Sequence, residues 1–341
     1  MRRILIVKMS SMGDVLHTLP AITEAVRHIP ELQFDWVVEK GFEQIPSWHP
    51  SVDKIIVAST RGWRKSWYSS RAERRTFISE LASREYDLVI DAQGLVKSAW
   101  IAHLARGPVS GFSFFSVRER LAPCLYKKRF NVPAGHAVKR VRTLLSLSLG
   151  YVLGDWVNDY GIDLGSAKVE RVDSATKTLL FLHGTTWASK HWPESHWIAL
   201  AQRSAEADYT VWLPWWSDEE HQRCVRIAAA CDAAVVLPRG DLNSMRKYIS
   251  AADAVVAVDT GLAHMAAALT VPCVSIYGST DSTRTGTWGA NQQHVRARFP
   301  CSPCLARECN LLSDTVLQPP CYESCSADDV WRVLSKMLGL D

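Results

Sequence analysis

The sequence predicts an α/β protein made of two parallel-sheet domains, and three observations lead to this expectation. Its 341 residues are enough for two domains of about 150 to 170 residues each. Short apolar runs alternate with stretches of helical periodicity, which is typical of a parallel sheet covered by helices on both faces. A polar, irregular stretch at residues 151–175 interrupts this alternation and is the best candidate for a domain boundary.

The apolar runs predict the strands, and the helical periods between them predict the helices. In the first half, a helix is expected over residues 11–28, and the expected strands are Ile4–Lys8, Phe34–Val38, Lys54–Val57 and Leu88–Asp91. In the second half, the expected strands are Thr178–Leu182, Tyr209–Leu213, Val235–Leu237, Ala254–Val258 and Cys273–Tyr277. The helices expected there are Ser195–Ala205, Glu219–Ala230, Leu242–Ala251, Gly261–Ala268 and Asp328–Leu338.

These elements define the domains that we expect. The first domain should span residues 1–165 and the second residues 166–325, and the closing segment 326–341 should pack back on the first domain as a helix. Two α/β sheets of similar size make a ligand site between the domains the default expectation.

Both domains carry a similar joint between a strand and the helix that follows it. Gly13 and Asp14 follow the first strand, and Asp259, Thr260 and Gly261 follow the strand Ala254–Val258. Open α/β sheets bind ligands at these carboxyl ends of strands, where a glycine allows close approach and free helix N–H groups accept phosphate. Neither joint matches GxGxxG or GxxxxGK[ST], so NAD binding and P-loop ATP hydrolysis lose support.

The stretch "HGTTWASKHWPESHW", residues 183–197, also joins an expected strand to an expected helix. Thr185 and Thr186 supply hydroxyl donors and Lys190 supplies a point charge, which together suit a pyrophosphate. A polar loop without a ligand is the alternative interpretation.

The second joint, "VDTGLAHMAAAL", combines groups for two kinds of ligand atom. Asp259 would repel a phosphate, so we assign it to sugar hydroxyls, whereas Thr260 and Gly261 offer backbone N–H groups to phosphate. His264 lies one helical turn after Thr260 and would face the same ligand, although a lone histidine is more often structural.

Positive charge is concentrated in the first half of the chain. Residues 1–165 contain 23 Lys and Arg against 16 Asp and Glu, whereas the remainder contains 16 against 19. The excess gathers in "TRGWRKSWYSSRAERR", residues 60–75, where Trp63, Trp67 and Tyr68 stand among six basic residues. We read this stretch as a basic loop for an anionic partner, namely nucleic acid, anionic lipid or a polyanionic sugar. A solvated loop without a partner is the alternative.

The nine cysteines fall into two groups. Four are scattered and read as small core residues: Cys124, Cys224, Cys231 and Cys273. Five are clustered: Cys301, Cys304, Cys309, Cys321 and Cys325. Zinc or an iron–sulfur cluster could use such a group, but the spacing fits no paired-CxxC ribbon and no histidine lies within it. We therefore favour a cysteine-rich surface loop without a metal, and leave its metal and redox state open.

The chain lacks signals for membrane insertion or export. No run of 18 apolar residues occurs, and the apolar stretch near the start is only four residues long before Lys8. We therefore expect a cytoplasmic protein.

Five stretches together resemble the lipopolysaccharide heptosyltransferases, glycosyltransferase family 9. They are "MSSMGDVLHTLPA", "FDWVVEKGFEQIPSWHP", "DAQGLVKSAW", "KHWPESHW" and "VDTGLAHMAAAL". The resemblance covers nearly the whole chain and is strongest to the members that add the first inner-core heptose. It implies a GT-B fold, in which two Rossmann-like domains with parallel sheets face each other across a cleft.

The same resemblance implies a reaction and its two substrates. The donor is ADP-L-glycero-β-D-manno-heptose, held mainly by the second domain, and the acceptor is the Kdo of Kdo2-lipid A, approached by the first. The transfer inverts the anomeric centre and needs neither a metal nor another cofactor. Three alternatives remain open: a heptosyltransferase II or other member acting on a heptosylated acceptor, a sugar-nucleotide epimerase of similar fold, and a nucleic-acid-binding module. The last is disfavoured because the basic patch is confined to one stretch.

The resemblance also assigns roles to individual residues. It implies that Asp14 is the catalytic base. The implied donor-binding residues are Thr185, Thr186, Lys190, Glu220, Asp259, Thr260, Gly261 and His264, where the neighbouring Glu219 leaves the assignment of Glu220 to the adenosine ribose open by one residue. The implied acceptor-binding residues are Arg61, Arg64, Lys65, Lys97 and Arg118.

Asp14 has a physical rationale beside the resemblance. At the start of a helix, the helix dipole should keep the carboxylate ionised and therefore available as a base. A purely structural helix cap is the alternative. The basic stretch further suggests peripheral attachment to the anionic inner-membrane surface, with Trp63 and Trp67 entering the interface.

Overall fold

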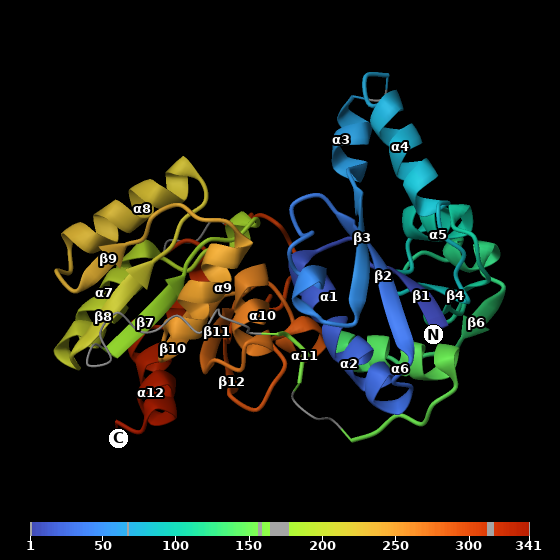
Figure 1. The fold of residues 1–341 in the computed structure, drawn as a ribbon. Helices are drawn as coiled ribbons and strands as arrows, with labels where there is room; N and C mark the ends of the chain where they lie inside the picture. The colour runs from blue at the N-terminus through green and yellow to red at the C-terminus, as the bar shows by residue number, and fades with distance from the viewer. Residues whose placement is uncertain (1, 67, 156–158, 164–176, 312–316, 341) are drawn as a thin grey trace. The chain divides into compact units, whose positions relative to one another are not determined.

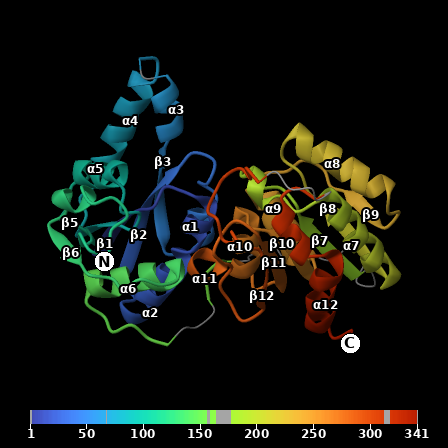
Figure 2. The same ribbon diagram turned by 180° about the vertical axis from the view of Figure 1, so that it is seen from behind.

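The computed structural model describes residues 2–66, 68–155, 159–163, 177–311 and 317–340. The chain forms two compact units, Met1–Asp163 and Leu164–Asp341. Each unit is an α/β domain built on one parallel sheet of six strands (Figures 1 and 2). The boundary expected between residues 165 and 166 falls outside the described residues.

The first unit has its strands in the order β3-β2-β1-β4-β5-β6, all parallel. The strands are β1 (Arg2–Val7), β2 (Leu32–Glu39), β3 (Val52–Ala58), β4 (Leu88–Asp91), β5 (Val109–Phe112) and β6 (Lys128–Phe130). The helices are α1 (Met12–Leu16), α2 (Leu19–His28), α3 (Thr60–Lys65), α4 (Arg71–Leu81), α5 (Val96–Leu104) and α6 (Ala137–Leu149).

Helices bury both faces of the central strand β1. Residues Ile4–Val7 are fully buried, as the uninterrupted apolar run predicts for a strand covered on two sides. Leu5 and Val7 join a core with residues of α4 and α5. The alternating residues point to the opposite face, where α2 and α6 pack against each other.

The second unit repeats this topology. Its sheet has the order β12-β11-β10-β7-β8-β9, again parallel throughout. The strands are β7 (Lys177–Leu182), β8 (Tyr209–Leu213), β9 (Ala234–Val236), β10 (Ala254–Val258), β11 (Cys273–Tyr277) and β12 (Gln292–Arg296). The helices are α7 (Glu194–Glu206), α8 (Asp218–Ala229), α9 (Leu242–Ala251), α10 (Gly261–Ala268), α11 (Ser282–Thr285) and α12 (Ala327–Leu338).

Counted within its own unit, each sheet has the strand order 3-2-1-4-5-6 of a dinucleotide-binding fold. The strand order reverses direction between β1 and β4 in the first unit and between β7 and β10 in the second. A ligand crevice opens at such a switch point, outside the carboxyl ends of the two strands. The topology therefore predicts that ligand-binding residues lie in the loops after these four strands.

The structure differs from the sequence-based expectations in two helical regions. The helix expected over residues 11–28 is two helices, α1 and α2, because Pro20 in the first turn of α2 has no N–H to continue the ladder. The expected basic loop is largely helical and forms α3 and the start of α4, a pair that projects beyond the end of β3 (Figure 1).

The closing helix α12 belongs to the second unit. It packs against α7, β11 and β12, and its Val330 and Leu334 are fully buried in the core of the second unit. Its apolar face is thus used within the second unit, and the expected packing of this helix on the first domain stays a prediction. Within the described part of the chain, no helix is long and apolar enough to cross a bilayer.

Candidate functional site

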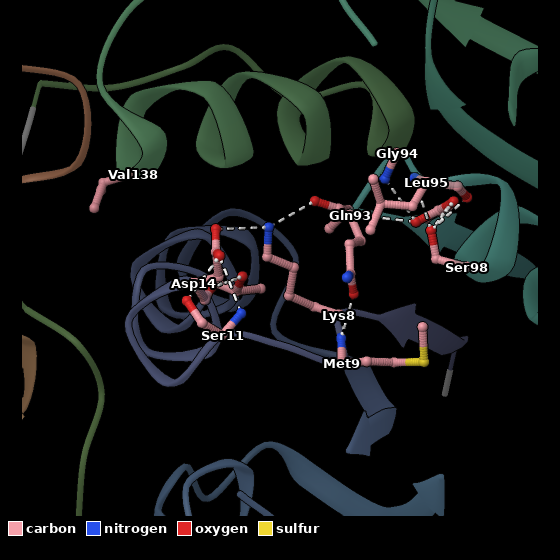
Figure 3. Close-up of polar contacts among 12 residues, drawn as sticks. Lys8, Met9, Ser11, Asp14, Gln93, Gly94, Leu95, Ser98 and Val138 are labelled. Atoms are coloured by element: carbon pink, nitrogen blue, oxygen red, sulfur yellow. Dashed lines mark hydrogen bonds and ion pairs between the residues drawn. The ribbon is translucent and has the colours of Figure 1, made fainter. Parts of the chain in front are cut away.

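Asp14 lies at the switch point of the first sheet, in the short helix α1 that follows β1. The backbone N–H of Ser11 donates to Asp14 Oδ2 at 3.0 Å and the Ser11 hydroxyl donates to the same oxygen at 3.1 Å. Asp14 Oδ1 faces the Lys8 ammonium at 3.3 Å (Figure 3). The Asp14 side chain keeps 34% of its surface exposed, so the carboxylate is anchored yet open to a reactant.

Lys8 connects Asp14 to the next strand of the switch point. This residue follows β1 directly, and its Nζ also donates to the carbonyl of Ala92, just after β4, at 3.1 Å. Only 8% of the Lys8 side chain is exposed. A buried ammonium needs a compensating charge, and here Asp14 supplies it.

The contacts of Asp14 determine its protonation state. Burial raises the pKa of this carboxyl, but the charge of Lys8 and the hydrogen bonds from Lys8 and Ser11 outweigh burial, and the pKa lies below its ordinary value. Asp14 is therefore ionised near neutral pH. The sequence suggested the helix dipole as the cause, whereas the structure points to Lys8 and Ser11.

A second carboxylate, the buried Asp91, organises the end of β4. Asp91 Oδ1 accepts from the backbone N–H groups of Gln93 and Gly94, and Asp91 Oδ2 accepts from the hydroxyls of Ser98 and Tyr126 at 2.8 and 2.6 Å. These contacts shape the loop between β4 and α5, which begins with Ala92. Asp91 thus fixes the loop whose Ala92 carbonyl accepts the hydrogen bond from Lys8.

The predicted acceptor-binding residues lie on α3, α5 and the loop after β5. Arg64 and Lys97 line one pocket of about 630 Å³ together with the half-exposed ring of Trp100. Arg118 is exposed next to Glu119, another residue of the pocket lining. The exposed side chains of Arg61 and Lys65 are on α3, but neither is part of this lining.

The aromatic residues of the basic stretch differ from expectation. Trp63 is 8% exposed and packs on Phe77 of α4 with ring centroids 5.1 Å apart, so the expected insertion of Trp63 into a membrane is wrong. Trp67 lies outside the described residues. Tyr68 is 93% exposed, so in this stretch it is Tyr68, and not Trp63, whose ring faces outward.

At the switch point of the second sheet, the structure brings together the loops after β7 and β10. Lys190 Nζ forms an ion pair with Asp259 Oδ2 at 2.7 Å, and the Thr185 hydroxyl donates to the Asp259 carbonyl at 3.1 Å. Thr280, after β11, donates its hydroxyl to Asp259 Oδ2 at 2.6 Å. Asp259 therefore organises the loop around Lys190. Thr186 is exposed beside Thr185.

The turn after Asp259 begins helix α10. Thr260 is the N-cap residue and Gly261 the first helical residue, so backbone N–H groups of this first turn are oriented away from the helix. The structure buries His264 in the same helix, with 6% exposure. A helix N-terminus that follows a strand at a switch point is a suitable place for a phosphate group.

The two glutamates proposed to contact a ribose differ in their exposure and in their contacts. Glu219 is 83% exposed and forms an i,i+4 ion pair with Arg223, 3.7 Å away. Glu220 accepts a hydrogen bond from the backbone N–H of Trp216 at 2.7 Å and lies so close to Gly184 that a Cβ there would collide with its carboxylate. Glu220 thus faces the loop after β7, and its contact with a ribose stays a prediction.

Several residues of these sites escaped the sequence analysis. Lys8, Thr280, Trp187 and Arg307 are such residues, and their partners come from other strands or from distant segments. Only Lys8 had a local signal, because it is a charged residue at the end of an apolar run and a few residues before Asp14.

The clustered cysteines are free thiols. Cys301 and Cys304 are exposed, Cys309 is partly buried, and Cys321 and Cys325 are buried. Among the described residues, no group of three or more Cys, His, Asp or Glu side chains is arranged to hold a metal ion. The pKa of Cys321 is raised to about 12, first by burial and then by the neighbouring cysteines, so this thiol is protonated at neutral pH.

Comparisons with known proteins agree with this architecture. The family model for glycosyltransferase family 9 (heptosyltransferase) matches residues 74–313. The lipopolysaccharide heptosyltransferase 1 of Pseudomonas aeruginosa is 49% identical over 311 residues, which is 90% of this chain and 87% of the relative. The structure also superposes on E. coli heptosyltransferase WaaC with ADP-2-deoxy-2-fluoro heptose, with a TM-score of 0.85, 39% identity and coverage of 98% and 99%.

A second structure, E. coli heptosyltransferase WaaC with ADP, superposes with a TM-score of 0.87 at 40% identity, covering 98% of this chain and 99% of that one. Both match the two Rossmann-like domains, so the fold is that of a GT-B glycosyltransferase. On the extent of the family match and the identity to its relatives, the chain belongs to glycosyltransferase family 9, the heptosyltransferases.

Proposed function

We propose that this protein transfers L-glycero-D-manno-heptose from ADP-heptose to the Kdo of Kdo2-lipid A, in lipopolysaccharide inner-core biosynthesis. The observation that carries the proposal is the pair of switch points: one presents an ionised carboxylate, Asp14, and the other presents Lys190 beside a helix N-terminus. The sequence relatives and the ADP-bound WaaC structures support the choice of donor and of the first transfer. They disfavour the epimerase alternative.

In this proposal, the second unit holds the donor. Lys190 and the N–H groups at Thr260 and Gly261 bind the diphosphate and stabilise the negative charge that develops on the leaving ADP. These groups supply the positive charge that a metal supplies in other transferases, so we propose a metal-independent transfer. Glu220 accepts hydrogen bonds from the adenosine ribose hydroxyls, and Asp259 and His264 contact the sugar.

In the first unit, Asp14 acts as the general base. It removes the proton from the attacking Kdo hydroxyl as that oxygen bonds to the anomeric carbon and the bond to the β-phosphate oxygen breaks. A single displacement of this kind inverts the anomeric centre. The carboxylate also stabilises the oxocarbenium-like charge of the transition state. Arg64 and Lys97 would meet the carboxylate and phosphate groups of the acceptor, together with Arg61, Lys65 and Arg118.

An ADP-release assay tests the role of Asp14. Asp14→Asn keeps the shape of the side chain and removes the base, so turnover should fall about 10²- to 10⁴-fold while ADP affinity is retained. Near-normal turnover would remove Asp14 from this role. Supplying Kdo2-lipid A and a heptosylated acceptor separately distinguishes a first from a second heptose transfer.

We also propose that the protein works as a peripheral protein at the anionic inner membrane, where its acceptor resides. The support is the exposed basic surface of α3 and α4, including Arg71 and Arg75, beside the exposed Tyr68. Each basic residue near an anionic surface contributes about 1 kcal/mol, so Arg71→Gln with Arg75→Gln should weaken vesicle binding by more than tenfold. Co-sedimentation with anionic and with zwitterionic vesicles measures this. Binding that is insensitive to salt would contradict an electrostatic attachment.

A further inference from the structure

Lys190 shares the indole ring of Trp187 with a second cation, Arg307, from a segment far away in the sequence. The ammonium of Lys190 lies 4.3 Å from the ring centroid of Trp187, and the guanidinium of Arg307 lies 5.6 Å from the same centroid. The two cationic groups therefore cannot be farther apart than the sum of these distances. An indole that contacts two cations holds both near the loop after β7.

Backbone contacts fasten the segment that carries Arg307 to this loop. The N–H of Ser189 donates to the Arg307 carbonyl at 3.1 Å, and the Ser189 hydroxyl donates to the Ala306 carbonyl at 2.6 Å. On the other side, the N–H of Leu305 donates to the carbonyl of Ser279, which follows β11, at 2.7 Å. The position of Arg307 is thus built into the fold and does not depend on the guanidinium contact alone.

The positive charge of Lys190 is largely neutralised by Asp259, so a bound diphosphate would be stabilised by a second cation. Asp259 pairs with Lys190 at 2.7 Å, so the net charge of that pair is close to zero. A diphosphate that met only Lys190 would have to compete with this carboxylate for the ammonium. Within the described residues, Arg307 forms no ion pair, and its side chain is exposed. Its charge is therefore available to an anion that approaches Lys190.

We infer that Arg307 is a donor-binding residue that contacts the diphosphate of the sugar nucleotide together with Lys190. The inference rests on the proposed function, because it takes ADP-heptose as the donor. Arg307 can form a bidentate contact with phosphate oxygens, which the point charge of Lys190 cannot. Trp187 holds the two cations near the anion, and the segment containing Cys301, Cys304 and Cys309 gains a role as the carrier of Arg307.

Calorimetric titration with ADP, AMP and adenosine tests this inference. Arg307→Gln should weaken ADP binding about tenfold, as expected for the loss of one charge-assisted contact, and should leave adenosine binding unchanged. The loss should shrink as salt is added, and Arg307→Lys should recover part of the affinity. In turnover assays, the effect should appear mainly in the KM for the donor. Arg332→Gln is the matched control, because Arg332 is exposed on α12 and paired with Asp329 in the same unit.

The outcomes separate this inference from the proposed function. If the wild type binds ADP and Arg307→Gln binds it equally well, the role of Arg307 is refuted while the proposed function stands. If adenosine binding falls as much as ADP binding, the variant has disturbed the nucleoside site, and the phosphate contact is refuted too. If the wild type binds no ADP, both proposals fail.

Discussion

Removal of the Lys8 ammonium is the sharpest test of how the first switch point sets the state of Asp14. Lys8→Met keeps a long apolar side chain in the buried position and deletes the charge 3.3 Å from Asp14 Oδ1. At this distance, Coulomb's law gives about 5 kcal/mol at an effective dielectric constant of 20 and about 1 kcal/mol in bulk water. Because 34% of the Asp14 side chain is exposed, screening places the effect toward the lower figure, at roughly 1–2 kcal/mol.

The sign of the effect follows from the groups around the carboxyl. Burial raises the pKa of Asp14 and Lys8 lowers it, so without the ammonium the pKa rises. A base must be ionised to accept a proton, and the acid limb of kcat/KM should therefore move to higher pH in Lys8→Met. ADP release measured between about pH 4 and 8 records this limb.

A matched control is available in the same unit. Lys54 forms an ion pair with Glu80, also at 3.3 Å, away from Asp14, so Lys54→Met should leave the limb in place. The melting temperature of each variant shows whether it folds. A folded Lys8→Met protein whose acid limb stays in place, or moves to lower pH, would refute the reasoning.

Three further predictions concern the second sheet and a buried histidine. Lys190→Gln should weaken ADP binding by more than about tenfold and lower the melting temperature, because Asp259 keeps its charge but loses its cation; calorimetry and thermal melts measure the two effects. Gly184→Ala should weaken ADP binding and leave the fold intact, because its Cβ displaces the Glu220 carboxylate; unchanged affinity would contradict the contact. Burial lowers the pKa of His49 from 6.5 to about 4. Between these two pH values, His49 is protonated in the unfolded chain and neutral in the folded chain. The free energy of unfolding should consequently decrease by up to about 3 kcal/mol as pH falls from 6.5 to 4, and denaturant titrations of His49→Gln should show a shallower decrease.

The apolar runs were enough to predict most of the central strands. Strands β4, β8, β10 and β11 have the bounds expected from the sequence, because each is rich in apolar residues that the fold buries. Strands β5, β6 and β12 were missed because no continuous apolar run marks them. The break between α1 and α2 was missed because apolar periodicity continues across Pro20.

The candidate site divides in a similar way between local and long-range information. The sequence was enough to place Asp14, Lys190 and Thr260 between a strand and the helical segment that follows it, which is where parallel sheets bind ligands, and its motifs resembled the family. It could not show that Asp259 meets Lys190, since that contact depends on neighbours in the sheet and not on neighbours in the chain.

Tertiary structure decided the chemistry of these groups. The Ala92 carbonyl accepts a hydrogen bond from the Lys8 ammonium because β4 pairs with β1, and Asp259 reaches Lys190 because β10 pairs with β7. Arg307 reaches Trp187 only through the fold of a segment more than a hundred residues away in the sequence. A side chain's charge is encoded locally, but its pKa and its ligand depend on the groups that the fold brings within a few ångströms.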